Sequence, residues 1–249
     1  MSPPSMLVAR LRTWLERLRA DALDALAVVL PVTCASCGAV DRALCRRCGE
    51  HLARDTGVRA CELRVVAGDG SRIPVFAASD YEGAVKALIA ALKERGRTDA
   101  ARPLGLLLRR AMSGLAESAR APASATGPTP AWVPVLAPSS PRSRRARGYA
   151  HLAVLWEVAV PGTRGVDGLR VSRLVRDQAG LSRHGRAANL RGAYVADPRL
   201  AGARVVLVDD VVTSGATIRE SVRALEAVGA VVIGCAVIAE TRRKSPQSP

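Results

Sequence analysis

The chain has 249 residues, 49% of them hydrophobic, and its 37 Lys and Arg against 22 Asp and Glu leave a formal net charge of +15. That much apolar side-chain surface can form a folded core, so the composition excludes a disordered polybasic chain. No apolar run approaches the roughly 18 residues that a membrane-spanning helix needs. We therefore expect a soluble, cytoplasmic protein of one or two domains.

Residues 1–30 are predicted to form an amphipathic helix. Apolar residues recur there at helical spacing, with charged residues at the other positions: Leu7, Leu11, Trp14, Leu15, Leu18, Ala22, Leu26 and Val29. The charges exclude a secretory signal, whose core is uncharged, and Pro31 ends the helix. We expect the helix to pack against the rest of the protein, and the alternative is a membrane surface or a partner.

The segment 31–61 carries two Cys-x-x-Cys pairs separated by seven residues. Gly38 and Gly49 follow the pairs, which is typical of two tight turns that direct four thiolates to one tetrahedral ion. Two disulfides, which need an oxidising compartment, or a redox dithiol are the alternatives. Four thiolates leave no open coordination position, so we predict a structural Zn²⁺ ion held by Cys34, Cys37, Cys45 and Cys48. Cys61 and Cys235 are interpreted as ordinary residues.

Strands and helices alternate in the rest of the chain. Strands are predicted over 72–78, 132–137, 170–175, 205–210 and 231–239, and helices over 83–95, 101–119, 149–160 and 215–228. The proline-rich stretch 122–130 divides a helical, substrate-side segment (72–121) from an α/β domain (131–240). Short apolar strands alternating with helices indicate a parallel sheet covered on both faces. Residues 241–249 are predicted to form a disordered tail.

A phosphate site is predicted where the strand 205–210 leads into the helix 215–228. The strand ends in Asp209 and Asp210, and a turn rich in hydroxyl groups and glycine follows: Thr213, Ser214, Gly215, Ala216 and Thr217. Free N–H groups at a helix start, together with these hydroxyls, bind a phosphate group, and Gly215 lets the backbone approach closely. Two acids would repel that phosphate unless they bind sugar hydroxyls or a divalent cation. A simple Thr213 N-cap explains neither the acids nor the pattern.

The positive charge is concentrated between Ser139 and Arg191. Eleven arginines and three acids there give a net charge of +8. We therefore expect a polyanion to bind near this segment, whether nucleic acid or a small polyphosphate.

The thirteen residues 205–217 resemble the signature of the type I phosphoribosyltransferases. In that superfamily two acids hold the ribose 2′ and 3′ hydroxyls of phosphoribosyl pyrophosphate (PRPP), and the loop binds its 5′-phosphate. The resemblance implies that Asp209 and Asp210 are the catalytic acids and that they bind PRPP together with residues 213–217. It also implies Mg²⁺, bound with PRPP, to neutralise the leaving pyrophosphate.

Further motifs extend from Pro31 to Glu240: the four cysteines, Tyr81-Glu82-Gly83, Leu88-Ile89, Leu92-Lys93, Val133-Pro134-Val135, Arg144 to Tyr149, and Arg173 to Asn189. In this order they resemble the ComF/GntX (ComFC-like) family of competence-associated, phosphoribosyltransferase-like proteins. Two departures stand out. Ala150-His151 replaces the family's Asn-Gln, and only Cys61 remains of a second cysteine set, so one zinc ion is expected.

The basic residues are given roles by the same resemblance. Arg142, Arg144, Arg145 and Arg147 take the place of the pyrophosphate loop, and Gln178, Arg183, His184 and Arg186 lie in a stretch that could close over the substrate. Of these we assign PRPP binding to Arg147, Arg186 and Gln178, and the alternative is a solvated surface.

Three functions stay open. The first is an active pentosyltransferase with an unknown acceptor. The second is a non-catalytic accessory protein of DNA uptake or utilisation that binds single-stranded DNA or a helicase partner. The third is a PRPP sensor without chemistry. An aromatic content of 3% disfavours stacking on bases, so DNA contacts would be to the backbone.

Overall fold

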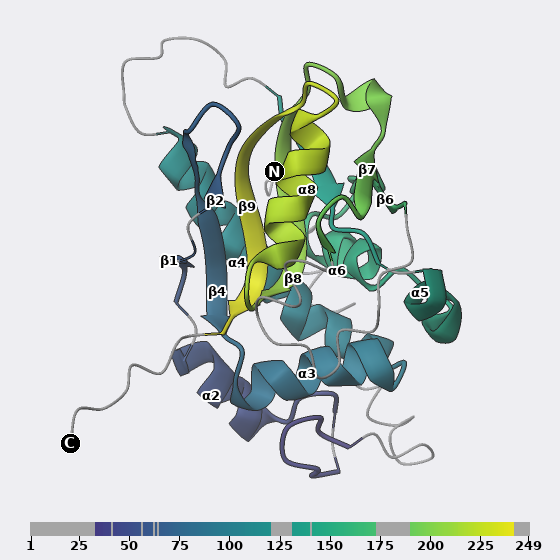
Figure 1. Ribbon diagram of the computed structural model, residues 1–249. Coiled ribbons are helices and arrows are strands. Elements are labelled where there is room, and N and C mark those ends of the chain that lie inside the picture. Colours follow the sequence, from purple (N-terminus) through teal and green to yellow (C-terminus); the bar gives the residue numbers. More distant parts are fainter. Residues whose placement is uncertain are drawn as a thin grey trace, which may run out of the picture.

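The computed structural model describes residues 33–40, 42–55, 57–61, 63, 65–120, 131–139, 141–172 and 190–241. Several predictions lie outside these residues: the N-terminal helix (1–30), the tail from residue 242 onward, and the stretch 173–189 with Gln178, Arg183, His184 and Arg186. The described part is a mixed α/β structure in which helices flank one central sheet (Figure 1).

The central sheet has five strands in the order β1-β4-β9-β8-β5. Their bounds are β1 Arg59–Ala60, β4 Val75–Asp80, β5 Val133–Leu136, β8 Arg204–Val212 and β9 Val231–Glu240. All neighbours are parallel except β1, which pairs antiparallel with β4. The long strands β8 and β9 are nearly continuous buried apolar runs, as parallel strands covered on both faces must be. The predicted α/β class with a parallel sheet is confirmed, and because β4 belongs to this sheet, the segments 72–121 and 131–240 share it.

Each face of the sheet is covered by different elements. On one face pack α4 (Ala101–Arg120) and α6 (His151–Ala159). Helix α3 (Gly83–Glu94) joins the same core at the carboxyl ends of the strands, with the short η1 (Thr98–Ala100) between α3 and α4 (Figure 1). On the other face lie α8 (Ala216–Glu226), η2 (Pro198–Leu200) and the two small sheets. Alternation along β8 explains the division, because Val206 and Val208 belong to the first core and Val205 and Leu207 to the second.

Two helices lie outside these layers. Helix α2 (Arg46–Asp55) contacts α3 beyond the carboxyl ends of the strands, at the bottom of Figure 1, and α5 (Pro141–Arg147) lies at one side. Within the described residues, no helix combines the length and apolar character needed to cross a membrane.

Two strand predictions need correction. The predicted strand 72–78 is divided at Pro74 into β3 (Arg72–Ile73) and β4, and β3 forms a hairpin with β2 (Val65–Val66). A proline has no N–H to donate to a strand ladder, which explains the break. Of the strand expected at 170–175, residues 170 and 171 belong to β6 (Leu169–Val171), which pairs antiparallel with β7 (Tyr194–Ala196) outside the central sheet, and residues 173–175 lie outside the described residues. The apolar residues of β6 flank Arg170 rather than forming a continuous run, the pattern of a half-buried strand.

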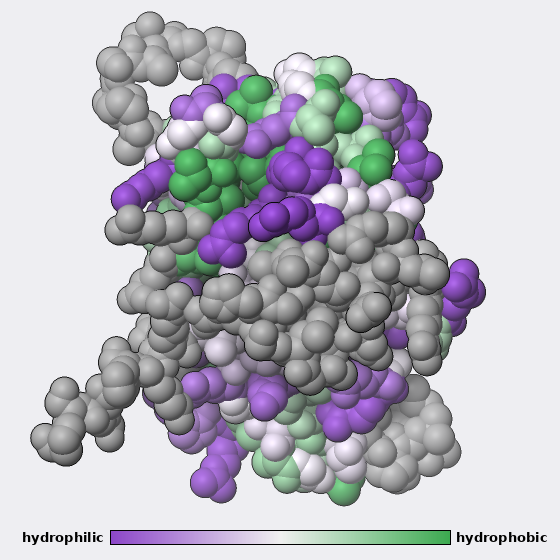
Figure 2. All heavy atoms as spheres, viewed as in Figure 1, coloured by the Kyte–Doolittle hydropathy of each residue, from purple (hydrophilic) through white to green (hydrophobic). Residues whose placement is uncertain are grey.

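The surface over α8 and the neighbouring strands is mixed. Figure 2 shows hydrophilic side chains next to small hydrophobic groups on this face. The large hydrophobic residues that are exposed in the described part are mostly valines on separate elements, such as Val66, Val195 and Val231. Single exposed valines are ordinary on protein surfaces.

Candidate active site and metal centre

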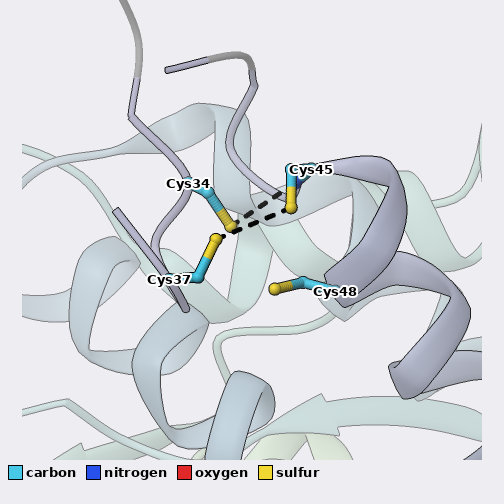
Figure 3. A group of neighbouring side chains, drawn as sticks. All are labelled: Cys34, Cys37, Cys45 and Cys48. Atoms are coloured by element: carbon cyan, nitrogen blue, oxygen red, sulfur yellow. Dashed lines mark hydrogen bonds between the residues drawn. The ribbon is translucent and has the colours of Figure 1, made fainter. Parts of the chain in front are cut away.

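The four cysteines form one cluster. All four Sγ atoms lie within 4.8 Å of one another, and all four thiols are free rather than joined in disulfides. Figure 3 shows Cys34 and Cys37 on a loop, facing Cys45 and Cys48 from the start of α2. The Sγ atoms of Cys37 and Cys45 are 3.7 Å apart. Zn–S bonds of about 2.3 Å in a tetrahedron require S–S separations of ~3.8 Å. The cluster can therefore hold a metal ion such as zinc, as predicted.

The two cysteine pairs are positioned differently. The first pair lies in a tight turn, where the N–H of Gly38 donates to the carbonyl of Cys34 at 2.9 Å and Gly38 has φ +76°. The second turn was predicted wrongly, because Gly49 lies inside α2. Cys45 directly precedes α2 and Cys48 lies in its first turn. Residues three apart lie on the same face of a helix, so a helix start directs two thiols as well as a turn does.

The surroundings of the thiols favour a thiolate at Cys34. Burial opposes ionisation, but backbone N–H groups, first that of Cys45 at 3.4 Å from the sulfur, lower the pKa of Cys34 to about 6. At Cys48 a hydrogen bond from Ser36 favours the thiolate, yet burial and the other thiols raise the pKa to about 12. Clustered thiolates thus oppose one another, and a divalent cation at their centre would offset that repulsion.

The four-cysteine element is anchored beside α3. Leu52 of α2 is buried in the core formed with α3 and α4, and Ala35 and Leu44 pack against it. The Arg97 guanidinium, which follows α3, donates to the carbonyl of Thr33. The four-cysteine element therefore packs on the core that α3 and α4 share.

The predicted acids lie within β8, on opposite faces of the sheet. Successive side chains of a strand alternate in direction. Asp210 shares its face with Val206 and Val208, toward α3 and α6, whereas Asp209 shares its face with Leu207, toward α8 and β7. Both side chains are buried. The acids therefore meet different groups.

Asp210 contacts two cationic or potentially cationic side chains. Lys93 Nζ from the last turn of α3 forms an ion pair with Oδ2, and His151 Nε2 from the start of α6 lies 3.1 Å from the same oxygen. Burial would raise the pKa of Asp210, but Lys93 and then His151 hold it well below its usual range. Burial likewise opposes the charge of Lys93, and Asp210 reverses this and raises the Lys93 pKa. Lys93 and His151 both occur in the sequence motifs described above, but local spacing does not link either residue to Asp210.

Asp209 is the less readily ionised of the two acids. Burial and the charge of Asp210 raise its pKa, and Lys93 and the N–H of Asp210 counteract only part of this rise. That N–H donates to Asp209 Oδ1 at 2.9 Å. Burial and the charge of Asp209 raise the pKa of the Tyr194 phenol to about 12, and a hydrogen bond with Thr217 opposes this rise. Tyr194 was not among the predicted site residues, and no local motif marks it.

The loop 213–217 connects β8 to α8. Gly215, not Thr213, is the N-cap residue, with φ +75° and no side-chain capping bond, so the simple Thr213 N-cap is excluded. Ser214 Oγ accepts from the N–H of Ala216 at 3.4 Å, and Arg219 Nη1 donates to the carbonyl of Ser214 at 2.8 Å. The side chain of Leu63 lies against the backbone at Gly215, and its methyl groups would lie 2.6 Å from an added Cβ.

The basic segment after β5 reaches the same edge of the sheet. The N–H of Ala137, just past β5, donates to the carbonyl of Val208 at 2.8 Å, so the chain leaves the sheet beside Asp209. The expected pyrophosphate loop contains α5. On it, Arg144 pairs with Asp167 at 2.9 Å. The Nε atom of Arg147 is buried, and it donates no hydrogen bond to any group in the part of the chain that the structure describes.

Comparison with known proteins adds one match. Residues 173–248 match the family model of the phosphoribosyl transferase domain. No curated protein matches the chain. The matched residues include β7, β8, α8 and β9, and with them the acid pair and the loop 213–217. The α/β fold and this match together support a phosphoribosyltransferase-like protein of the type I superfamily.

Proposed function

We propose that this chain binds PRPP with Mg²⁺ and transfers its phosphoribosyl group to an acceptor that is still to be identified. The observation that carries the proposal is the arrangement of the acid pair and the loop 213–217 in one segment that matches a phosphoribosyl transferase domain. We further propose membership in the ComF/GntX family and a cytoplasmic location, on the order of the motifs along the chain.

The PRPP groups are assigned to residues by charge and place. The 5′-phosphate binds at Thr213–Thr217, where the start of α8 offers backbone N–H groups. The ribose hydroxyls bind Asp209 and Asp210, and the pyrophosphate binds Arg147 together with Arg186 and Gln178. Mg²⁺, when bound with PRPP, neutralises the leaving pyrophosphate. As the bond from C1 to pyrophosphate breaks, the buried carboxylate of Asp210 stabilises the positive charge that develops on the ribose.

The contact of Lys93 with Asp210 removes an objection to this assignment. Two carboxylates beside a phosphate cup would repel a polyanion. Lys93 offsets the charge of Asp210, and Asp209 has a raised pKa because of burial and Asp210. The acid pair therefore presents less negative charge to PRPP than its sequence indicates.

The metal at the cysteine cluster is proposed to be a structural zinc ion. Four thiolates at tetrahedral spacing suit Zn²⁺, and full coordination by sulfur leaves no position for a substrate or water. Its function is to hold residues 33–55 against α3.

A PRPP titration of the purified protein by calorimetry, with and without Mg²⁺, tests the proposal. We expect binding that requires Mg²⁺ and that weakens at least ~10-fold in Asp209→Asn, because an amide replaces the buried carboxyl group that is proposed to bind a ribose hydroxyl. Asp197→Asn is the matched control, since Asp197 pairs with Arg199 on a surface turn. Absence of PRPP binding in the wild-type protein would refute the proposal. Release of pyrophosphate with a panel of bases and amines distinguishes a transferase from a PRPP sensor.

A second function is favoured by α5. This helix carries four arginines and no acid, and Arg145 is exposed. Such a surface suits the backbone of single-stranded DNA, or a helicase partner, in an accessory role in DNA uptake. DNA binding that falls steeply with salt and survives Asp209→Asn would support this function, and binding that is absent or insensitive to salt would exclude it.

A further inference from the structure

We propose that Lys93 and His151 are positioning residues that hold the Asp210 carboxylate by one oxygen and leave its other oxygen to accept a ribose hydroxyl. The inference rests on the proposed function, because it assigns how the second acid of the PRPP site is prepared. Neither residue is expected to contact PRPP.

The contacts are one-sided. Lys93 Nζ and His151 Nε2 both reach Oδ2 of Asp210. The contacts that these two side chains make with the Asp210 carboxylate are all to Oδ2, and neither of them is to Oδ1. Two donors from different helices on one oxygen prevent rotation of the carboxylate, so Oδ1 has a fixed direction.

The two donors are themselves held in place. Lys93 lies in the last turn of α3, where the helix dipole favours a cation, and His151 is the first residue of α6. The hydroxyl of Tyr149 donates to the carbonyl of Leu92, which joins these two helix ends beside the contact. The side chain of His151 is 6% exposed and packed between the layers. Positioning by fixed helix ends costs little reorganisation when a ligand arrives.

Burial makes a cationic partner necessary. The side chain of Asp210 is 5% exposed, and a carboxylate that deep without a cation takes up a proton instead of remaining charged. A protonated acid would no longer offer a charged acceptor to the ribose. His151 donates to the Asp210 carboxylate through Nε2, so in a neutral ring Nδ1 carries no proton. Nδ1 is buried and has no hydrogen-bond partner in the described part of the chain. His151 therefore acts through the single Nε2 contact.

The test compares variants by PRPP affinity in the presence of Mg²⁺. Lys93→Met should bind PRPP about 10- to 100-fold more weakly, the range for losing a charged hydrogen-bond partner. Lys93→Arg should retain most of the wild-type PRPP affinity, because arginine is also a cationic donor. Lys86→Met is the matched control, since Lys86 is exposed on the same helix, and it should bind like the wild-type protein.

His151 supplies an independent pair of variants. His151→Gln keeps an N–H donor and should stay within ~3-fold of wild type, whereas His151→Leu should lose about 10-fold. Should Lys93→Met fail to fold, as judged by circular dichroism, this pair and Lys93→Arg decide the question alone.

A double variant separates positioning from general damage. If Lys93 acts only through Asp210, then Lys93→Met adds less than ~3-fold to the loss caused by Asp210→Asn. Additive losses, or wild-type affinity in both Lys93→Met and His151→Leu, overturn the inference while the proposed function stands. A wild-type protein that does not bind PRPP overturns both.

Discussion

Replacement of Gly215 by alanine tests the geometry of the loop at the start of α8. Gly215 has φ +75°, a left-handed conformation that costs an L-residue roughly 1–2 kcal/mol. The new Cβ would also lie 2.6 Å from both methyl groups of Leu63, closer than side chains tolerate. Forcing a side chain aside in this way typically costs about 1–3 kcal/mol. We therefore expect Gly215→Ala to lower the free energy of unfolding by about 2–5 kcal/mol.

Two controls separate the backbone cost from the clash. Gly70 lies in the turn between β2 and β3 with φ +84°, and an added Cβ there meets nothing within 4 Å. Gly70→Ala should therefore show the left-handed cost alone, roughly 1–2 kcal/mol. Adding Leu63→Ala to Gly215→Ala removes the clash, so the two changes should be less destabilising together than the sum of the single changes.

Urea denaturation followed by tryptophan fluorescence measures these free energies, and a PRPP titration measures the effect on the site. An alanine does not readily hold the left-handed φ of Gly215, so the loop backbone should shift in Gly215→Ala. PRPP binding should therefore weaken at least ~10-fold in Gly215→Ala but not in Gly70→Ala. Equal stability of Gly215→Ala and Gly70→Ala would show that Leu63 does not cover the loop. Equal stability of Gly215→Ala and the wild type would refute the left-handed conformation itself.

Three further outcomes follow from other parts of the structure. Purified, reduced protein should contain about one zinc ion per chain, and Cys48→Ala should lower both the metal content and the unfolding midpoint; a folded, reduced wild type without metal would contradict the four-thiolate site. Burial alone would raise the pKa of Glu220, but Arg223 lowers this pKa below the ordinary 4.5. The ionised Glu220 therefore stabilises the fold above pH 4.5, and this contribution is lost as the pH falls through the lowered pKa. The stability difference between wild type and Glu220→Gln should shrink on acidification, and a difference that grows would show that the ion pair is not formed. Trp156 is fully buried, so Trp156→Ala should cost about 3–5 kcal/mol in a denaturation experiment, and the half-buried Trp132 provides the comparison that must cost less.

The local parts of the site could be predicted because their residues are close in sequence. The four cysteines lie within residues 34–48, and spacing alone indicates that they can meet. The strand, acid pair and loop of residues 205–217 are likewise one continuous segment. The opposite directions of Asp209 and Asp210 could also have been read from the sequence, since neighbours on a strand face opposite sides.

The partners of the acids were decided by the tertiary structure. His151 is 59 positions from Asp210 in sequence, and Lys93 comes from a helix on the far side of the stretch 122–130. Periodicity marked α3 and α6 as helices but not the end of each that reaches β8, because this depends on how the helices pack on the sheet. The antiparallel pairing of β6 with β7 was missed for the same reason.

The sequence by itself determined which chemical groups this protein has and which of them are neighbours along the chain. The fold decided that the acids are buried, that one of them is paired with Lys93 and His151, and that Leu63 lies on the loop. The physical reason is that burial and charge pairing arise from contacts between segments far apart in sequence, which local spacing does not specify.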